Sequence, residues 1–229
     1  MSTLMDNTSQ VCIVGLGPAG LGAALTLSKS MISSHVLCLE QGDLAVNRAC
    51  SALQNDICER KEPCQVIAGF GGSSLLSGGK VSSFPAGGGL ATILGSSDLA
   101  EKKLEQSIQM LSTHLSMQKH KEKQADIARA AEFFTTLGFE YKYYDVYQFH
   151  PADLKDTYAN LHSLLESRGM TFLLNTRLID VDREGHGFRL TALKGSKTFS
   201  FLTKYLVLGV GRSGQNTVGQ LNTKLDLGS

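Results

Sequence analysis

The chain has 229 residues, a formal net charge of +1 and 42% hydrophobic residues. This balance excludes a disordered or collagen-like chain, and the lack of a basic excess argues against a nucleic-acid partner. The five cysteines are an odd number and contain no C-x-x-C pair, which fits neither a disulfide framework nor a zinc site. We therefore expect free thiols, a cytoplasmic location and no metal.

The apolar run over residues 11–27 resembles a signal or membrane segment at first sight. It is shorter than the ~20 residues that span a bilayer, glycines and Pro18 interrupt it, and no Lys or Arg precedes it. We therefore expect no membrane association.

The first forty residues predict a βαβ unit. Residues 11–14 are typical of a short buried strand, residues 15–30 of a tight turn into a helix, and residues 35–40 of a second buried strand. This order implies a parallel sheet. Residues 42–62 are mixed and polar, which fits either a helix or a long loop.

The middle of the chain combines a glycine-rich loop with two amphipathic helices. Residues 69–90 are rich in Gly and Ser, but interspersed apolar residues indicate a packed, functional loop. Helical spacing then predicts two helices, separated by a solvated charged connection at 119–124 that could alternatively bind an anionic partner. Their apolar positions are Leu104, Ile108, Leu111 and Leu115, then Ile127, Ala130, Phe134 and Leu137, with Gly138 as C-cap.

The last third predicts strands around one more helix. Residues 139–149 alternate as strands or a hairpin, and residues 170–181, 187–193 and 199–210 are typical of strands, with a turn at 194–197. The helix between them ends at Arg168 and Gly169, and its apolar face is Leu154, Tyr158, Leu161 and Leu165.

The strongest functional signal is a G-x-G-x-x-G motif formed by Gly15, Gly17 and Gly20. It follows a predicted strand and opens a predicted helix, which is the context that dinucleotide binding requires. The first glycine allows a tight turn, the second lets the backbone approach a pyrophosphate, and the third lets the helix pack against the sheet. The helix N-terminus favours phosphate charge, and Pro18 suits its first turn.

Glu40 lies twenty residues after Gly20, at the end of the second predicted strand. A carboxylate there can accept hydrogen bonds from both ribose hydroxyls of an adenosine, and it would repel a 2′-phosphate, which argues against NADP. Two other interpretations are a glycine-rich turn without ligand beside a surface acid, and a methyltransferase that binds S-adenosylmethionine.

The sequence resembles a known family. Residues 14–28 and 36–42 resemble the N-terminus of FAD-dependent oxidoreductases of the glutathione-reductase-type class with two dinucleotide-binding motifs. Residues 69–80 (GFGGSSLLSGGK), 173–181 (LLNTRLIDV) and 205–214 (YLVLGVGRSG) resemble segments of the bacterial FAD-dependent, NAD-utilising dehydrogenases. The resemblance covers most of residues 10–215.

The resemblance implies FAD as the cofactor. It assigns the pyrophosphate to the glycine turn, the adenosine ribose to Glu40, the pyrophosphate and flavin edge to the second glycine loop, and the adenine side to the last strand end. The cofactor-binding residues so expected are Gly15, Gly17, Pro18, Ala19, Gly20, Glu40, Gly71, Gly72, Ser73, Ser74, Gly209 and Gly211.

Two departures from the family pattern bear on catalysis. Gly78 stands where the family has an Asp, and the chain ends soon after residue 214, which predicts a truncated product or a shortened relative.

No catalytic residue is identifiable. Lys80 and Arg212 could neutralise phosphate, meet an anionic substrate or be ordinary surface charges. His150 and His162 could transfer protons, although a structural role is the favoured interpretation of both. A tyrosine cluster could line a substrate face: Tyr141, Tyr143, Tyr144 and Tyr147.

We therefore predict an α/β fold, in which a Rossmann-like parallel sheet carries an antiparallel β-meander and an inserted helical and strand segment. The FAD-binding domain would comprise residues 1–95 and 151–215, the insertion 96–150, and the start of a truncated C-terminal portion 216–229. The predicted function is hydride transfer between FAD and an organic substrate or nicotinamide. The alternatives are a non-catalytic or incomplete dinucleotide-binding fragment and an NAD-dependent dehydrogenase. Expected partners are a small-molecule substrate and NAD(P)H, with an oligomer or a completing chain also open.

Overall fold

The computed structural model describes residues 8–76, 78–149 and 151–225. The chain forms two compact units, one of Met1–Ser77 with Lys155–Ser229 and the other of Gly78–Leu154. The second unit thus begins earlier and ends later than the insertion expected at 96–150.

The first unit is built on a six-stranded mixed sheet. The strands β6, β2, β1 and β9 are parallel, and β9, β8 and β7 form an antiparallel meander. The long strand β9 joins the two parts, because its first half pairs with β8 and its second half with β1. In sheet order the strands are β6 (Thr171–Leu173), β2 (Val36–Leu39), β1 (Thr8–Val14), β9 (Lys197–Leu208), β8 (Gly187–Lys194) and β7 (Arg177–Glu184).

This topology confirms the predicted α/β class, the βαβ start and the meander. The single strand expected at 170–181 is wrong, because the chain turns at Asn175 and continues on the opposite edge of the sheet. Asn175 has a φ of 53°, a left-handed conformation that asparagine tolerates better than most residues, and its amide donates to the carbonyl of Gly42.

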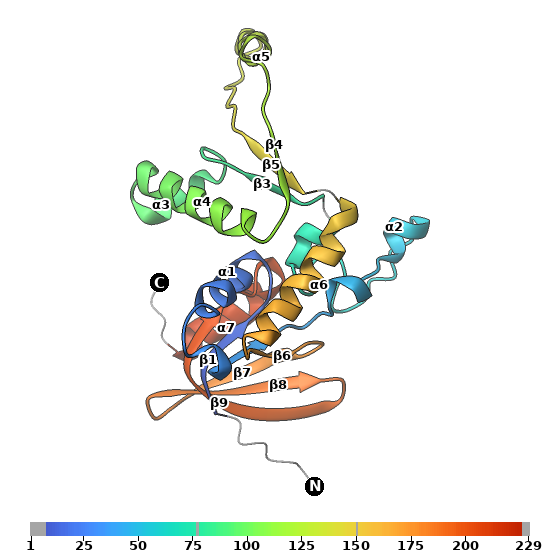
Figure 1. Cartoon of the computed structure of the whole chain (residues 1–229), viewed down its shortest axis with the longest axis vertical. Helices are drawn as coiled ribbons and strands as arrows, with labels where there is room; N and C mark the ends of the chain where they lie inside the picture. Colours follow the sequence, from blue (N-terminus) through green and yellow to red (C-terminus); the bar gives the residue numbers. More distant parts are fainter. Residues whose placement is uncertain (1–7, 77, 150, 226–229) are drawn as a thin grey trace. The chain divides into compact units, whose positions relative to one another are not determined.

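Helices cover both faces of this sheet (Figure 1). Alternate residues of a strand face opposite sides, so Cys12 packs with Leu221 of α7 (Gln215–Leu225), while Ile13 faces α1 (Pro18–Leu27). The helix α6 (Pro151–Ser167) lies on the α1 side, where Arg168 just after its end donates to the Ser28 hydroxyl at 2.8 Å. The predicted apolar face of α6 is buried at Leu154, Tyr158, Leu161 and Leu165.

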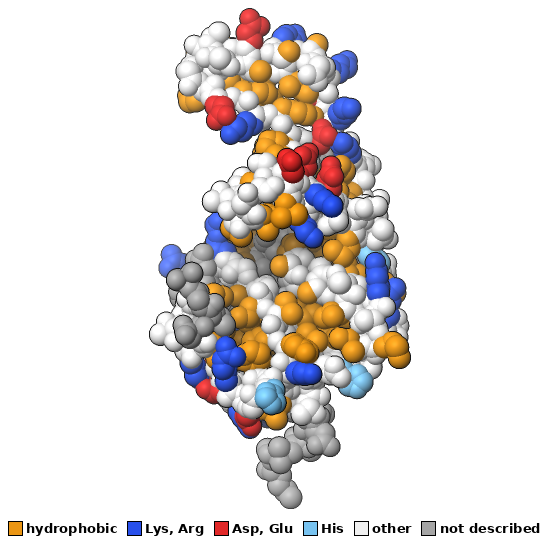
Figure 2. Space-filling view, turned by 90° about the vertical axis from the view of Figure 1, so that its left-hand side faces the viewer, with side chains coloured by type: hydrophobic (Ala, Val, Ile, Leu, Met, Phe, Trp, Pro, Cys, Tyr) orange, Lys and Arg blue, Asp and Glu red, His pale blue; other side chains and the backbone are white. Residues whose placement is uncertain are grey.

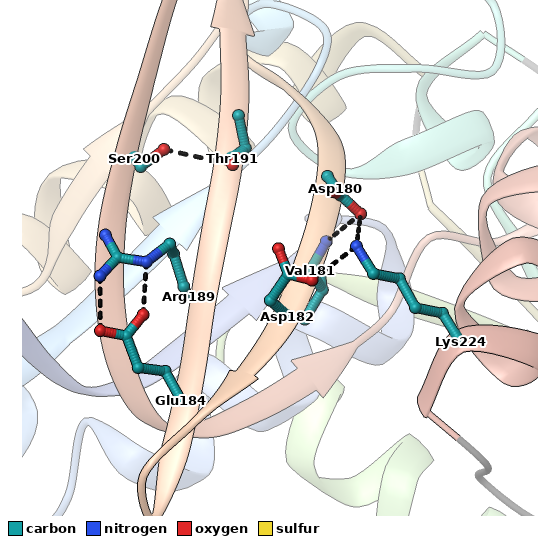
Figure 3. Close-up of polar contacts among 8 residues, drawn as sticks. All are labelled: Asp180, Val181, Asp182, Glu184, Arg189, Thr191, Ser200 and Lys224. Carbon is teal, nitrogen blue, oxygen red and sulfur yellow. Dashed lines mark hydrogen bonds and ion pairs between the residues drawn. The ribbon is translucent and has the colours of Figure 1, made fainter.

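Exposed ion pairs link strands of the meander to each other and connect α7 to it (Figure 3). Lys224 of α7 lies 2.6 Å from Asp180 and 2.7 Å from Asp182 of β7. Glu184 pairs with Arg189 across the β7–β8 hairpin. These contacts are side chain to side chain and open to solvent.

Among its described residues, the second unit contains a small antiparallel sheet, the helices α3, α4 and α5, and the start of α6. The charged segment 119–124 was expected to be a solvated connection, but Lys119 and His120 belong to strand β4. Lys119 is held there because it pairs with Asp145 at 2.6 Å and lies over the Tyr147 ring of β5. Only the last part of 139–149 is a strand. The strands are β3 (Lys80–Ser82), β5 (Val146–Phe149) and β4 (Met117–His120), in sheet order, and the helices are α3 (Gly88–Leu94), α4 (Ser97–Ser112) and α5 (Gln124–Thr136).

The helix α5 exists as predicted, but its apolar face is not buried within the described residues. Phe134 is 41% exposed and Leu137 is 55% exposed, and apolar side chains lie open on this segment in Figure 2. Gly138 ends the helix with a φ of 80°, as expected for a C-cap glycine.

The remaining described segments are short. Residues 42–62, expected as a helix or a long loop, are mostly loop with a 3-10 turn η2 (Ala45–Asn47) and one helical turn and a half, α2 (Ser51–Asn55). Further 3-10 turns are η1 (Ser33–His35), η3 (Gly72–Leu75) and η4 (Arg212–Gly214). Across the described ranges, none of the helices combines the length and the apolar character that a bilayer span needs.

Candidate functional site

A cavity of about 1330 Å³ lies in the first unit, at the carboxyl ends of its parallel strands. Val14, Leu39 and Leu208, which close β1, β2 and β9, all line it. Ligands of open α/β sheets bind at this edge, because the loops that follow the strands converge there. The cavity is therefore the candidate site.

The glycine turn between β1 and α1 is packed backbone against backbone. Gly15 has a φ of +88°, and a Cβ there would lie 2.5 Å from the Gly209 carbonyl oxygen. A Cβ on Gly20 would lie 1.8 Å from the Gly15 carbonyl oxygen. The Gly209 amide donates to the Val14 carbonyl at 2.7 Å, which locks β9 to the same turn. Larger residues at these positions would push the helix away from the sheet.

Gly17 plays a different part, because a Cβ there would reach only ordinary van der Waals contact with its neighbours. It is the N-cap of α1 with a φ of −71°, and a Cβ there would meet nothing closer than the Gly72 Cα at 3.8 Å. No side chain caps the helix, and Pro18 occupies its first turn. The first amides of a helix have no partner inside it, so this end offers donors and the positive end of the helix dipole to an anion. Gly17, Pro18 and Ala19 all line the cavity.

Glu40 lines the cavity but is 5% exposed, and its carboxylate is already engaged. Its Oε2 accepts the Leu16 amide at 2.7 Å, and its Oε1 accepts the amides of Gly42 and Gly69, both at 2.9 Å. A carboxylate offers about four lone-pair sites, so one on Oε2 remains in this arrangement. Glu40 can thus accept one further hydrogen bond, from a hydroxyl group, while it keeps its hydrogen bonds from three backbone amides.

The second glycine loop lies directly against the first. The Gly71 amide donates to the Leu16 carbonyl at 2.9 Å, and a Cβ on Gly72 would lie 2.9 Å from the Gly17 Cα. Gly72 and Ser73 line the cavity. Gly71 instead faces the Tyr158 ring, and the Ser74 hydroxyl lies 2.6 Å from the Tyr158 hydroxyl.

The structure thus brings most of the predicted cofactor-binding residues to one cavity and gives three of them packing roles. The lining residues are Gly15, Gly17, Pro18, Ala19, Glu40, Gly72, Ser73, Gly209 and Gly211. Gly20 packs α1 on the turn, while Gly71 and Ser74 contact Tyr158.

Arg48 is a buried residue that the sequence analysis missed. It is 1% exposed, in the loop after β2, and its guanidinium donates to backbone carbonyls of residues 65, 66, 70 and 72. Burial lowers the pKa of Arg48, and the charge of Glu40 opposes that change. Nothing in the polar stretch 42–62 distinguishes this arginine from a surface charge.

Further lining residues come from segments that carry no motif. Asn175, Thr176 and Arg177 enter the cavity from the turn between β6 and β7, and Thr217 and Val218 from α7. The wall also carries charges of both signs, with Lys61 paired to Glu59 at 2.9 Å, and the charged lining includes Arg60, Arg212 and Glu62. Of these lining residues, Arg212 alone was a candidate from the sequence, because the others lie in segments without a motif and reach the cavity only through the folded chain.

The proposed proton donors lie elsewhere. His162 of α6 is buried between the rings of Phe70 and Phe172, with Nδ1 3.2 Å from Glu166, and it does not line the cavity. Its Nε2 is buried without a partner among the described residues. His150 lies outside the described residues. Lys80 and the tyrosines 141, 143, 144 and 147 belong to the second unit.

The cysteines separate into two groups. Cys12 and Cys38 are buried in β1 and β2, where burial raises the pKa of both thiols, for Cys38 to about 12. Cys50, Cys58 and Cys64 line the cavity as free thiols. Among residues 8–76, 78–149 and 151–225, no three His, Cys, Asp or Glu side chains group as metal ligands.

A family model described as pyridine nucleotide-disulphide oxidoreductase matches residues 9–223, which is nearly the whole chain. The chain belongs to this family. The assignment confirms the family resemblance inferred from the glycine motifs, and the matched range contains every residue of the cavity. No curated protein matches the chain in sequence.

Solved structures similar to the chain include a glycine oxidase, a THI4 protein and an L-proline dehydrogenase. Glycine oxidase from Geobacillus kaustophilus is 18% identical with a TM-score of 0.41, over 97% of this chain and 59% of that one. THI4 from Thermovibrio ammonificans is 13% identical with a TM-score of 0.47, over 96% and 64%. L-proline dehydrogenase from P. horikoshii is 16% identical with a TM-score of 0.36, over 89% and 22%. The chain spans less than two thirds of each, and the family assignment rests on the match over residues 9–223.

Proposed function

We propose that the cavity of the first unit binds FAD, and that the chain is the dinucleotide-binding part of a flavin-dependent oxidoreductase. The observation that carries this proposal is the N-terminus of α1 at Gly17, which no side chain caps and which lines the cavity together with the second glycine loop. Small residues there allow a diphosphate to approach backbone amides that no side chain caps.

The chain's own residues would divide the binding between them. The first amides of α1 would hold the diphosphate, with Gly72 and Ser73 as the facing wall. The remaining lone pair on Glu40 Oε2 would accept one ribose hydroxyl, and its negative charge would disfavour a 2′-phosphate. Bound FAD would supply hydride chemistry, so the protein need only position and tune it.

The substrate, the electron donor and any completing chain belong to the same proposal, because the chain spans only part of the solved proteins. A small organic molecule and NAD(P)H are the partners we propose. The cytoplasmic location expected from the composition stays a prediction.

Purified protein tests the cofactor directly. We expect a flavin absorption band in the visible, and mass spectrometry of the ligand released on denaturation should identify FAD. At a free concentration of about 100 times its Kd, FAD should add about 2.7 kcal/mol to the free energy of unfolding. Colourless protein that FAD neither binds nor stabilises would contradict the proposal.

A matched pair of glycine variants locates the binding. Gly17→Val should fold, because its φ of −71° suits any residue and its Cβ would reach only van der Waals contact with the Gly72 Cα at 3.8 Å, but it should lose FAD because the valine blocks the approach to the first amides of α1. Gly219→Val on α7 places the same side chain on a glycine with open surroundings that does not line the cavity, and should keep FAD. Equal FAD affinity in the two variants would place the ligand elsewhere.

The second candidate is NAD(H) in the same cavity, which the family's description as pyridine nucleotide oxidoreductases favours. The two candidates separate in a thermal unfolding assay. If NAD raises the unfolding temperature and FAD does not, the NAD-dependent alternative replaces the flavin proposal.

A further inference from the structure

The loop formed by residues 65–73 is held from one side by a single buried side chain. Arg48 donates from Nε and Nη2 to the Gln65 carbonyl at 3.0 and 2.9 Å, and from Nη2 to the Val66 carbonyl at 3.0 Å. Its Nη1 donates to the Phe70 carbonyl at 3.2 Å and to the Gly72 carbonyl at 2.8 Å. One guanidinium thus collects four carbonyls of the loop.

The amides of the same loop are held from the other side. The Gly69 amide donates to Glu40 at 2.9 Å, the Phe70 amide to the Asp43 carbonyl at 3.0 Å, and the Gly71 amide to the Leu16 carbonyl at 2.9 Å. The carbonyl and the amide of a trans peptide unit point in opposite directions. The peptide unit between residues 70 and 71 is therefore fixed at both ends, by Arg48 and by the first glycine turn.

The same geometry reaches the cavity wall. Because the Gly72 carbonyl points at Arg48, the amide of the next residue, Ser73, points away from it. Gly72 and Ser73 line the cavity opposite Gly17. The peptide units 70–71 and 72–73 are thus oriented by the Arg48 guanidinium through their carbonyls. The shape of the cavity wall at Gly72 and Ser73 depends on that orientation.

Arginine is the one side chain suited to this task. Buried carbonyls need donors, and a guanidinium presents five N–H groups in a rigid plane, whereas a lysine ammonium presents three from one point. Within the described residues Arg48 has no carboxylate at ion-pair distance, and the charge that compensates it is that of Glu40, on the amide side of the loop.

We propose that Arg48 is a positioning residue for the cofactor, which sets the conformation of residues 65–73 and so the wall that faces the diphosphate. This inference rests on the proposed function for its ligand, but the loop conformation itself can be measured without one. Arg48 does not line the cavity, so it acts through the backbone that it holds.

The test compares Arg48→Lys with two controls in the complete chain. Arg189→Lys makes the same change in an exposed ion pair of the meander, and Val181→Ala weakens the core at a residue outside the cavity. Circular dichroism establishes the temperature range in which each variant is folded. Within it, amide hydrogen exchange of residues 64–75 is measured without ligand, and FAD affinity is measured by titration.

We expect folded Arg48→Lys to exchange residues 64–75 at least tenfold faster than wild type and to bind FAD at least tenfold more weakly. Both controls should match the wild type in amide exchange and in FAD affinity. Because Val181→Ala should also be less stable, its match would show that lower stability alone changes neither readout. Arg48→Gln, which keeps two donors without the charge, should behave like Arg48→Lys. A further measurement needs no variant. In the wild type, FAD should slow the amide exchange of residues 64–75.

The outcomes separate the two proposals. Wild-type affinity and exchange in both Arg48 variants would overturn the positioning role and leave FAD binding intact. Faster exchange with unchanged affinity would also overturn it. If wild type binds no FAD, the proposed function fails, and the assignment of Arg48 to the cofactor fails with it. If neither Arg48 variant folds, the wild type decides. Amide exchange of residues 64–75 that is the same with and without FAD overturns the positioning role, and exchange that FAD slows supports it.

Discussion

The two sides of the first unit use charge and backbone in opposite ways. On the side of the glycine loops, backbone packs on backbone, and the buried Glu40 and Arg48 are satisfied by amides and carbonyls. On the meander side, apolar side chains fill the core, and Lys224 and Glu184 form ion pairs in solvent. The comparison teaches that the same type of charged residue contributes very differently to the free energy of unfolding in the two places. Burial removes the water that would otherwise replace a lost hydrogen-bond partner.

The largest effect should come from one methyl group placed in each region. Gly20→Ala sets a Cβ 1.8 Å from the Gly15 carbonyl oxygen, so the backbone must shift, and we expect a loss of more than about 3 kcal/mol in the free energy of unfolding. Gly219→Ala adds the same group to an exposed helix with nothing nearby and should stabilise by about 0.5–1 kcal/mol. Urea unfolding measures both. Equal effects would show that the first turn is not close-packed.

A pair of carboxylate variants sharpens the comparison next. Glu40→Gln keeps the shape of the side chain but turns an NH2 group toward one of three amides, and should cost about 1–3 kcal/mol. Glu184→Gln removes the charge from an exposed pair, and its urea midpoint should stay within error of the wild type. A small loss at Glu40 would mean that water reaches its amides.

A smaller effect should appear in the pH dependence of stability. Burial lowers the pKa of His162, and Glu166 only partly opposes this. In the unfolded chain His162 has a pKa of about 6.5, so below that pH the unfolded chain binds more protons than the folded one. The contribution of His162 to stability is therefore complete above a pH of about 6.5 and declines as the pH falls below it. The wild type should therefore lose more stability than His162→Leu between pH 8 and 5. Parallel urea midpoints for the two proteins across this range would contradict the assignment.

The smallest effect is expected where α7 meets the meander. Lys224→Met removes two exposed ion pairs with Asp180 and Asp182 but keeps the apolar stem. We expect a urea midpoint unchanged at high salt and at most slightly lowered at low salt. A large loss at both salt concentrations would show that these pairs, rather than Leu221 and Leu225, hold the helix.

The sequence predicted the part of the fold that local chemistry encodes. The turn at Gly15, the start of α1 at Pro18 and the acid that ends β2 follow from short-range steric and hydrogen-bonding needs. The meander followed from alternation and from the turn at 194–197. Most of the predicted site residues share one cavity for the same reason, since the loops that carry them follow parallel strands.

Long-range order determined what the sequence could not reveal. The split of 170–181 depends on Asn175 turning the chain toward the far edge of the sheet, and the strand character of Lys119 depends on a partner at Tyr147. Arg48 was missed because its role depends on carbonyls up to 24 residues away. Phe134 of α5 shows the reverse case, a helical pattern correctly identified but not buried among the described residues.

The central claim is that the first amides of α1 and the carboxylate of Glu40 hold a dinucleotide, and a crystal structure of the protein with FAD tests it most directly. We predict the diphosphate at the amides that follow Gly17, and one ribose hydroxyl on Glu40 Oε2 with its three amide contacts intact. FAD bound away from this turn, or no density for it at saturating concentration, would contradict the account.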